Sequence, residues 1–160
     1  MESEFSGSLG PFTFLNFLAN HPLLEDCHIR YLEEDVPNDS ETDTESGSPA
    51  SNLVIPHEIH LPQLRSMTMD WESKCSPLSI LPTLLRTLRT PSLVDLTFWL
   101  ADPYTDGVNL LSGVTHWLQA SHPPLTYLQI GTGSEAGIPP KDDLLNLLRP
   151  LSILKHLEIS

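Results

Sequence analysis

The chain has 160 residues and a formal net charge of −13, from 21 acidic residues against 8 lysines and arginines. This length suits one domain that buries its own core. No apolar run approaches the roughly 18 residues of a membrane-spanning helix, and no basic stripe is present to contact phosphates. The sequence therefore argues against a membrane protein and against direct binding of nucleic acid.

The first residues and the cysteines bear on the compartment. Residues 1–6 include acids but no lysine or arginine, which is not the pattern of a secretory signal. The two cysteines, Cys27 and Cys75, stand in no C-x-x-C or zinc-binding pattern. We therefore expect two ordinary thiols in a reducing compartment, either the cytoplasm or the nucleus.

A six-residue leucine motif, L-x-x-L-x-[LIMF], recurs along the chain. A weak first copy, LEDCHI at 24–29, precedes clear copies LRSMTM at 64–69, LVDLTF at 93–98, LTYLQI at 125–130 and LKHLEI at 154–159. The clear copies begin 29, 32 and 29 residues apart. This spacing predicts about five copies of one structural unit within a single domain, 1–160.

An acidic stretch separates the first copy from the second. Residues 31–64 contain eight of the acids and no lysine or arginine, so the rest of the chain is only mildly acidic. Residues 36–51 lack aromatic side chains and, after Val36, any large aliphatic one, which predicts a disordered acidic insertion. The hydroxyl residues Ser40, Thr42, Thr44 and Ser46 stand among these acids, which suits an acidophilic kinase, although a plain solvated loop explains them as well.

Amphipathic helices are predicted before the later copies of the motif. Two stretches carry apolar residues along one helical face: Ile80, Leu81, Leu84, Leu85 and Leu88, and then Leu110, Leu111, Val114, Trp117 and Leu118. A third helix is expected around Leu144, Leu145, Leu147 and Leu148.

The ends of these helices have their own signals. Ser76 before Pro77 offers an N-cap to the first helix, and Asp142 or Asp143 offers one to the third. Proline disfavours helix in the residue before it, so we expect helices to stop and strands to begin at Pro22, Pro91, Pro123 and Pro150.

The repeating unit is therefore a helix, a proline break and a short strand. Side chains alternate along a strand, so motif positions four and six face the helices while positions three and five face away. Stacked units bury the first set together, which predicts an α/β solenoid with a parallel sheet on one face and helices on the other. The predicted helix-facing residues are Met67, Met69, Leu96, Phe98, Leu128, Ile130, Leu157 and Ile159.

The last copy leaves a second interpretation open. Leu154, Leu157 and Ile159 are expected at an open end beside an unpaired edge strand, whereas terminal repeats normally carry a polar cap. A truncated or fragmentary repeat protein without independent activity would have such an end.

The motif copies, together with the stretch FLNFLANHPLLE at 14–25, resemble the leucine-rich-repeat regions of fungal F-box proteins. The resemblance implies a leucine-rich-repeat fold and an intracellular protein-binding role. In that family the repeats recruit a target, and an N-terminal F-box attaches the protein to a cullin-based ubiquitin ligase. No F-box-like helical segment precedes Phe12 here, so only the recruiting role carries over.

The resemblance places protein binding on the exposed motif positions three, five and seven. Trp99 and Tyr127 draw most interest among them, because aromatic side chains supply large contact areas in binding surfaces. A structural interpretation of Trp99, folded under a neighbouring loop, is equally open. The full predicted set is Asp26, His28, Arg30, Ser66, Thr68, Asp70, Asp95, Thr97, Trp99, Tyr127, Gln129, His156 and Glu158.

Three other stretches hint at chemistry without meeting its spacing rules. HEIH at 57–60 lacks the H-E-x-x-H spacing that puts two imidazoles on one helical face, and we expect a loop there. GTGSEAG at 131–137 departs from the dinucleotide fingerprint and lacks a Walker lysine, so a nucleotide-binding enzyme is a minor alternative to a long turn. DPYTDG at 102–107 has too few ligands for a calcium loop. We expect no catalytic residue, metal or cofactor.

Overall fold

The computed structural model describes residues 2–6, 11–30, 58–71, 81–100, 110–132 and 140–160. The expected acidic insertion at 36–51, the Ser76 cap, Cys75, and the stretch 102–107 lie outside these residues. The strands are β1 (Glu2–Ser6), β2 (Asp26–Arg30), β3 (Ile59–His60), β4 (Ser66–Trp71), β5 (Leu88–Arg89), β6 (Asp95–Leu100), β7 (Tyr127–Thr132) and β8 (His156–Ile159). The helices are α1 (Pro11–Asn20), α2 (Leu81–Thr87), α3 (Leu110–Ser121) and α4 (Lys141–Leu148).

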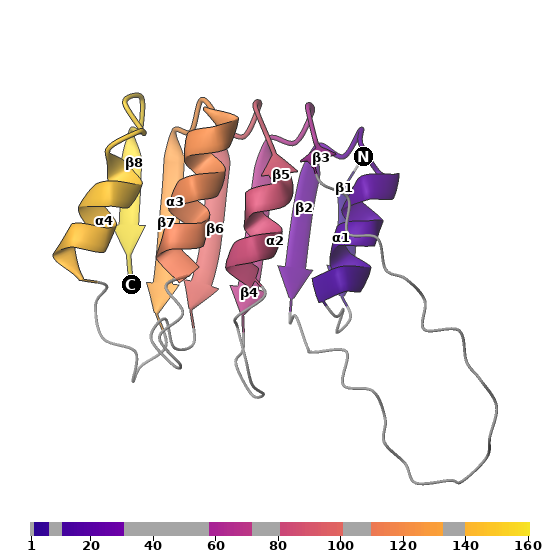
Figure 1. Ribbon diagram of the computed structural model, residues 1–160, viewed down its shortest axis with the longest axis horizontal. Coiled ribbons are helices and arrows are strands. Elements are labelled where there is room, and N and C mark those ends of the chain that lie inside the picture. Colours follow the sequence, from indigo (N-terminus) through magenta and orange to yellow (C-terminus); the bar gives the residue numbers. More distant parts are fainter. Residues whose placement is uncertain (1, 7–10, 31–57, 72–80, 101–109, 133–139) are drawn as a thin grey trace, which may run out of the picture.

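Six of these strands form one sheet in the order β1-β2-β4-β6-β7-β8, and every neighbouring pair is parallel. The four helices lie on one face of this sheet (Figure 1). The broad prediction of a mixed α/β fold with a parallel sheet and helices is thus confirmed. Strand β1 was not predicted, because its sequence, ESEFS, lacks the leucine pattern.

The motif copies lie side by side in constant register. Position four of one copy faces position four of the next, as in Met67 opposite Leu96 and Leu96 opposite Leu128. At each junction between copies the position-two carbonyl accepts hydrogen bonds from the next copy's position-two and position-three N–H groups. The acceptors are the carbonyls of Glu25, Arg65, Val94 and Thr126, at 2.7–3.3 Å.

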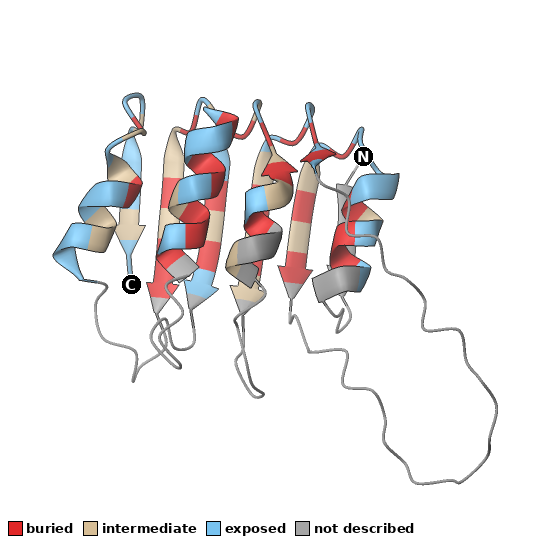
Figure 2. Ribbon diagram, viewed as in Figure 1, coloured by how far each residue is buried: buried red, intermediate tan, exposed pale blue. Residues whose placement is uncertain are grey.

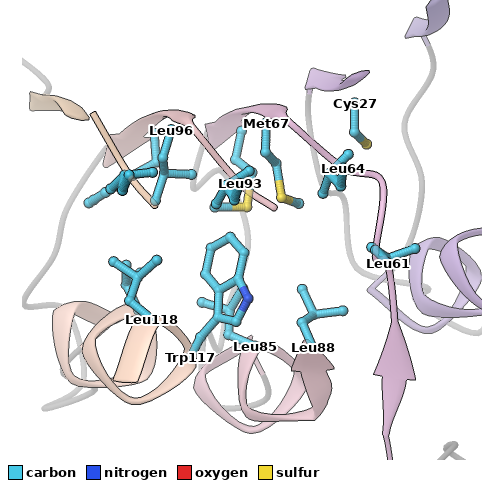
Figure 3. Close-up of a cluster of buried hydrophobic side chains, with 14 of the residues drawn as sticks. Cys27, Leu61, Leu64, Met67, Leu85, Leu88, Leu93, Leu96, Trp117 and Leu118 are labelled. Atoms are coloured by element: carbon cyan, nitrogen blue, oxygen red, sulfur yellow. The ribbon is translucent and has the colours of Figure 1, made fainter. Parts of the chain in front are cut away.

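The core lies between the sheet and the helices. Motif positions four and six are buried in β2, β4, β6 and β7, while position five is only partly buried, which gives the alternating bands of Figure 2. In Figure 3 Met67 and Leu96 of the strands, and Leu93 just before β6, point toward the helix residues Trp117 and Leu118. The expected apolar faces of α2 and α3 contribute to this core, as the burial of Leu85, Leu111, Val114, Trp117 and Leu118 shows.

Two neighbouring helices approach each other closely at a glycine. A Cβ atom on Gly113 of α3 would lie 2.7 Å from the Cα atom of Pro82 on α2. Glycine disfavours a helix, so its presence within α3 needs an explanation. The close approach of Pro82, which leaves no room for a Cβ atom, explains it.

The predicted end of α2 was wrong. Helix α2 stops at Thr87, and Leu88 begins the short strand β5, which pairs in parallel with β3 through Ile59–Leu88 and His60–Arg89. The loop expected for HEIH was therefore also wrong at its second half, since Ile59 and His60 are extended and paired. Its first residue, His57, lies outside the described residues.

The structure corrects two expectations at the far end of the sheet. Helix α4 begins at Lys141 after Pro140, so Asp142 and Asp143 lie in its first turn and neither caps it. Leu157 and Ile159 were expected to be covered by helices, yet they remain 40% and 38% exposed, because β8 has a neighbour on one side only among the described residues. No described helix is long and apolar enough to cross a membrane.

Candidate functional site: the exposed face of the sheet

The predicted binding residues lie on the sheet face away from the helices, in three rows that cross the strands. The constant register aligns motif positions three, five and seven of successive copies. The rows are Asp26, Ser66, Asp95, Tyr127 and His156; His28, Thr68, Thr97, Gln129 and Glu158; and Arg30, Asp70 and Trp99. The tertiary structure therefore brings this whole set onto one surface. For Arg30 only the backbone position is described.

Among the described side chains of this face, Trp99 is the large apolar one that remains exposed, at 39%. Its neighbour in the same row on β7 is Gly131. A Cβ atom built on Gly131 would lie 2.0–2.5 Å from three atoms of the six-membered ring of the indole, so the ring packs directly on the glycine backbone. Trp99 therefore rests on the adjacent strand, and more than a third of it stays open to solvent.

A second aromatic group stands at the other end of the face. The rings of Tyr127 and His156 are stacked with centroids 5.0 Å apart and planes 4° apart. The Tyr127 hydroxyl lies 3.3 Å from Oε1 of Gln129 and 3.4 Å from Oε2 of Glu158. Gln129 Nε2 in turn donates to Oε1 of Glu158 at 3.1 Å, which closes a network across β7 and β8.

This network changes the acidity of the tyrosine. Desolvation raises the pKa of Tyr127 above its ordinary value of 10.0, and the carboxylates of Glu158 and Asp95 raise it further. The hydroxyl therefore stays protonated and available as a hydrogen-bond donor throughout the neutral range.

The rest of the described face carries short polar side chains. Hydroxyl groups from Ser66, Thr68 and Thr97 occupy its centre, and carboxylates from Asp26, Asp70 and Asp95 surround them. The described residues contain no group of three or more histidine, cysteine or acidic side chains placed to hold a metal ion. Such a surface offers hydrogen bonds and aromatic contacts to a ligand.

Gly131 has a structural role that bears on the nucleotide-binding alternative. It belongs to β7 and lies beneath Trp99, so packing of the indole accounts for this glycine. Residues 133–139, which include the other glycines of GTGSEAG, lie outside the described part of the chain.

The sequence did not reveal a polar cluster on β3 and β5. Glu58 contacts Nε of Arg89 at 2.6 Å and Nε2 of His60 at 2.9 Å. These contacts lower the pKa of Glu58, the hydrogen bond from His60 most of all. The pairing of β3 with β5 brings these side chains together. A parallel pair of two residues per strand has no local sequence pattern, so the cluster could not be predicted.

A second feature missed by the sequence is a shallow polar hollow of about 260 Å³ between α3 and α4. It is lined by Ser112, Thr115, Gln119, Asp143, Asn146 and Arg149. The first three lie on α3, Asp143 and Asn146 lie on α4, and Arg149 directly follows α4, so only the helix pairing brings them together.

Comparison of the chain with models of known protein families, with curated proteins and with solved structures found no match. The family resemblance therefore rests on the motif residues alone.

Proposed function

We propose that this protein is a non-enzymatic protein-interaction module, a leucine-rich-repeat-like solenoid whose exposed sheet face binds a protein target. The observation that carries the proposal is the exposed indole of Trp99 held on Gly131. A large ring already fixed in place loses little conformational entropy on binding, which is the property of aromatic anchors in protein interfaces.

The surroundings of Trp99 support the same role. A partner that contacts the three rows meets aromatic surface at Trp99 and Tyr127, with hydrogen-bonding groups between them. Because Gln129 and Glu158 hold the tyrosine ring, it too is largely fixed before a partner arrives. The repeating junctions between motif copies support a solenoid of about five repeats.

The resemblance to F-box proteins suggests the biological use of this surface. We propose that the sheet face recruits a target, in the way that the leucine-rich repeats of a ubiquitin-ligase adaptor do. Co-purification with the adaptor subunit of a cullin-based ligase tests the attachment separately from target binding.

The test of the binding face compares partners recovered by the wild type and by the double variant Trp99→Ala, Tyr127→Ala. We expect the double variant to lose partners that the wild type retains, since truncated hot-spot residues typically cost about 2 kcal/mol or more each. Leu23→Ala is the matched control, because Leu23 is 68% exposed and lies in the turn before β2, outside the rows. Equal recovery by the wild type and the double variant would exclude the sheet face.

A further inference from the structure

Charge is distributed unevenly on the exposed face of the sheet. Its three rows continue by backbone register onto β1, at Glu2, Glu4 and Ser6. Acidic residues in the rows then outnumber basic ones by six to one: Glu2, Glu4, Asp26, Asp70, Asp95 and Glu158 against Arg30. Arg65 and Lys155 precede β4 and β8 at motif position two, about 16 Å from the row of Trp99. A partner of this face therefore meets a negative surface.

Two carboxylates near Trp99 remain available to a partner. Asp70 stands directly opposite Trp99 on β4, and Asp95 lies four residues before Trp99 on β6. Among the described side chains, none forms a salt bridge or a hydrogen bond with either carboxylate. Glu158, by contrast, is already held by the tyrosine and the glutamine of the network on β7. Asp70 and Asp95 are thus the carboxylates that a cation of the partner can pair with.

Trp99 is suited to bind a cation as well as an apolar group. The face of an indole attracts lysine and arginine side chains more strongly than the rings of tyrosine or phenylalanine do. The Trp99 ring is held on Gly131 and is 39% exposed, while Asp70 on the opposite neighbouring strand supplies a negative charge beside it. An aromatic ring next to a carboxylate favours a guanidinium or ammonium group over a neutral side chain.

The distance from Trp99 to Asp95 sets the spacing of the cations. Four strand residues separate motif positions three and seven, which is about 13 Å along the sheet. The face between them carries the uncharged side chains of Thr68 and Thr97. In an extended chain, residues i and i+4 are also about 13 Å apart and point to the same side. An extended segment that lies along β4 and β6 can therefore place one cation at each end.

We infer that the target of this face is an extended basic segment of another protein, with two lysine or arginine side chains four residues apart. One of them contacts Trp99 and Asp70, and the other contacts Asp95. This inference rests on the proposed binding function of the sheet face and adds the chemistry of the target. Surface ion pairs contribute little affinity each, so the charges select a basic partner more than they strengthen its binding.

The first test is an NMR titration of the 160-residue protein at low salt with a capped peptide, Ser-Thr-Arg-Val-Thr-Val-Arg-Thr-Ser. Its matched control carries citrulline, a neutral analogue of similar shape, in place of both arginines. We expect the arginine peptide to bind about tenfold more tightly, from one cation–π contact and two ion pairs, and its affinity to fall as salt is added. Absence of saturable binding, or equal binding of the two peptides, overturns the inference.

Variants of the protein test the assigned residues. Asp70→Asn, Asp95→Asn and Trp99→Leu should each weaken binding of the arginine peptide about two- to fivefold, with circular dichroism confirming that they remain folded. Asp142→Asn is the matched control, because it removes the same charge from an exposed residue of α4, in the helix layer. A loss of affinity in this control equal to that at Asp70 and Asp95, or none at Trp99, overturns the assignment.

A second peptide tests the spacing. Removal of one residue between the arginines puts them at i and i+3, on opposite sides of an extended chain. The charge of the peptide is unchanged, and we expect it to bind no better than a peptide with a single arginine. Equal binding of the i+3 and i+4 peptides overturns the extended geometry.

Partner recovery separates this inference from the proposed function. Partners that are lost by Trp99→Ala, Tyr127→Ala but retained by Asp70→Asn, Asp95→Asn overturn a basic target and leave the binding face in place. Partners that are retained by both double variants exclude the face itself.

Discussion

The indole of Trp99 lies on the backbone of Gly131 on the neighbouring strand, with its nearest atom 2.0 Å from where a Cβ atom would stand. This contact couples the exposed aromatic residue of the sheet face to the strand beside it. It also gives Gly131 a packing function, in a stretch for which a nucleotide-binding loop was only the minor alternative to a long turn.

The first prediction concerns this contact. Gly131→Ala should displace the indole and destabilise the fold by about 1–3 kcal/mol, the usual cost of overpacking. In a Trp99→Ala background the same substitution should cost much less, because the clash is gone. Urea denaturation of the four proteins of this double-mutant cycle measures the difference. Equal costs in both backgrounds would show that the two residues do not interact.

The second prediction concerns the acidity of Tyr127. Because its pKa is raised in the folded protein by burial, Glu158 and Asp95, the folded state holds the phenolic proton more tightly than the unfolded state. This contribution to stability is complete below the ordinary pKa of 10.0 and is lost as pH rises through the higher folded value.

Ultraviolet titration of the tyrosines checks this prediction, with Tyr127→Phe assigning the transition. Glu158→Gln should shift the Tyr127 transition toward lower pH, since it removes a negative charge beside the hydroxyl. A transition that stays in place in that variant would contradict the assigned cause.

The third prediction concerns the thiol of Cys27. This side chain is buried on β2, and desolvation raises its pKa to about 12. In a Cys75→Ser variant we expect the remaining thiol to resist a disulfide reagent at neutral pH while the protein is folded, because the thiolate is the reactive form. The thiol should react fully in denaturant. Rapid reaction in the native protein would show that the core around β2 opens readily.

The fourth prediction concerns a buried hydrogen bond between the residue after β5 and the last residue of α3. The backbone N–H of Thr90 donates to Oγ of Ser121 at 3.1 Å, and both residues are buried. Ser121→Ala leaves that N–H without its partner and should destabilise the fold by about 1–3 kcal/mol. Ser152→Ala, at an exposed serine in the turn before β8, is the control. Similar unfolding midpoints for both variants would contradict a stabilising role for this bond.

The sequence predicted the parts of the fold that depend on local pattern. The leucine motif placed strands at β2, β4, β6, β7 and β8 and identified which side chains point inward, because the alternation of a strand is a property of its own residues. The apolar face of α3 was likewise predicted from a local pattern, the spacing of its apolar residues along one side of a helix. The candidate site followed directly, since the residues between the buried ones must occupy the other face.

Only the tertiary structure decided how neighbouring segments meet. The positions of Trp99 over Gly131, of Tyr127 against His156, and of β3 beside β5 each depend on the register between strands that are distant in sequence. The sequence alone determined which residues of β2, β4, β6 and β7 face the helices and which face away from them. The contacts among the exposed ones came from strand pairing, because a register is a relationship between two segments and neither one specifies it alone.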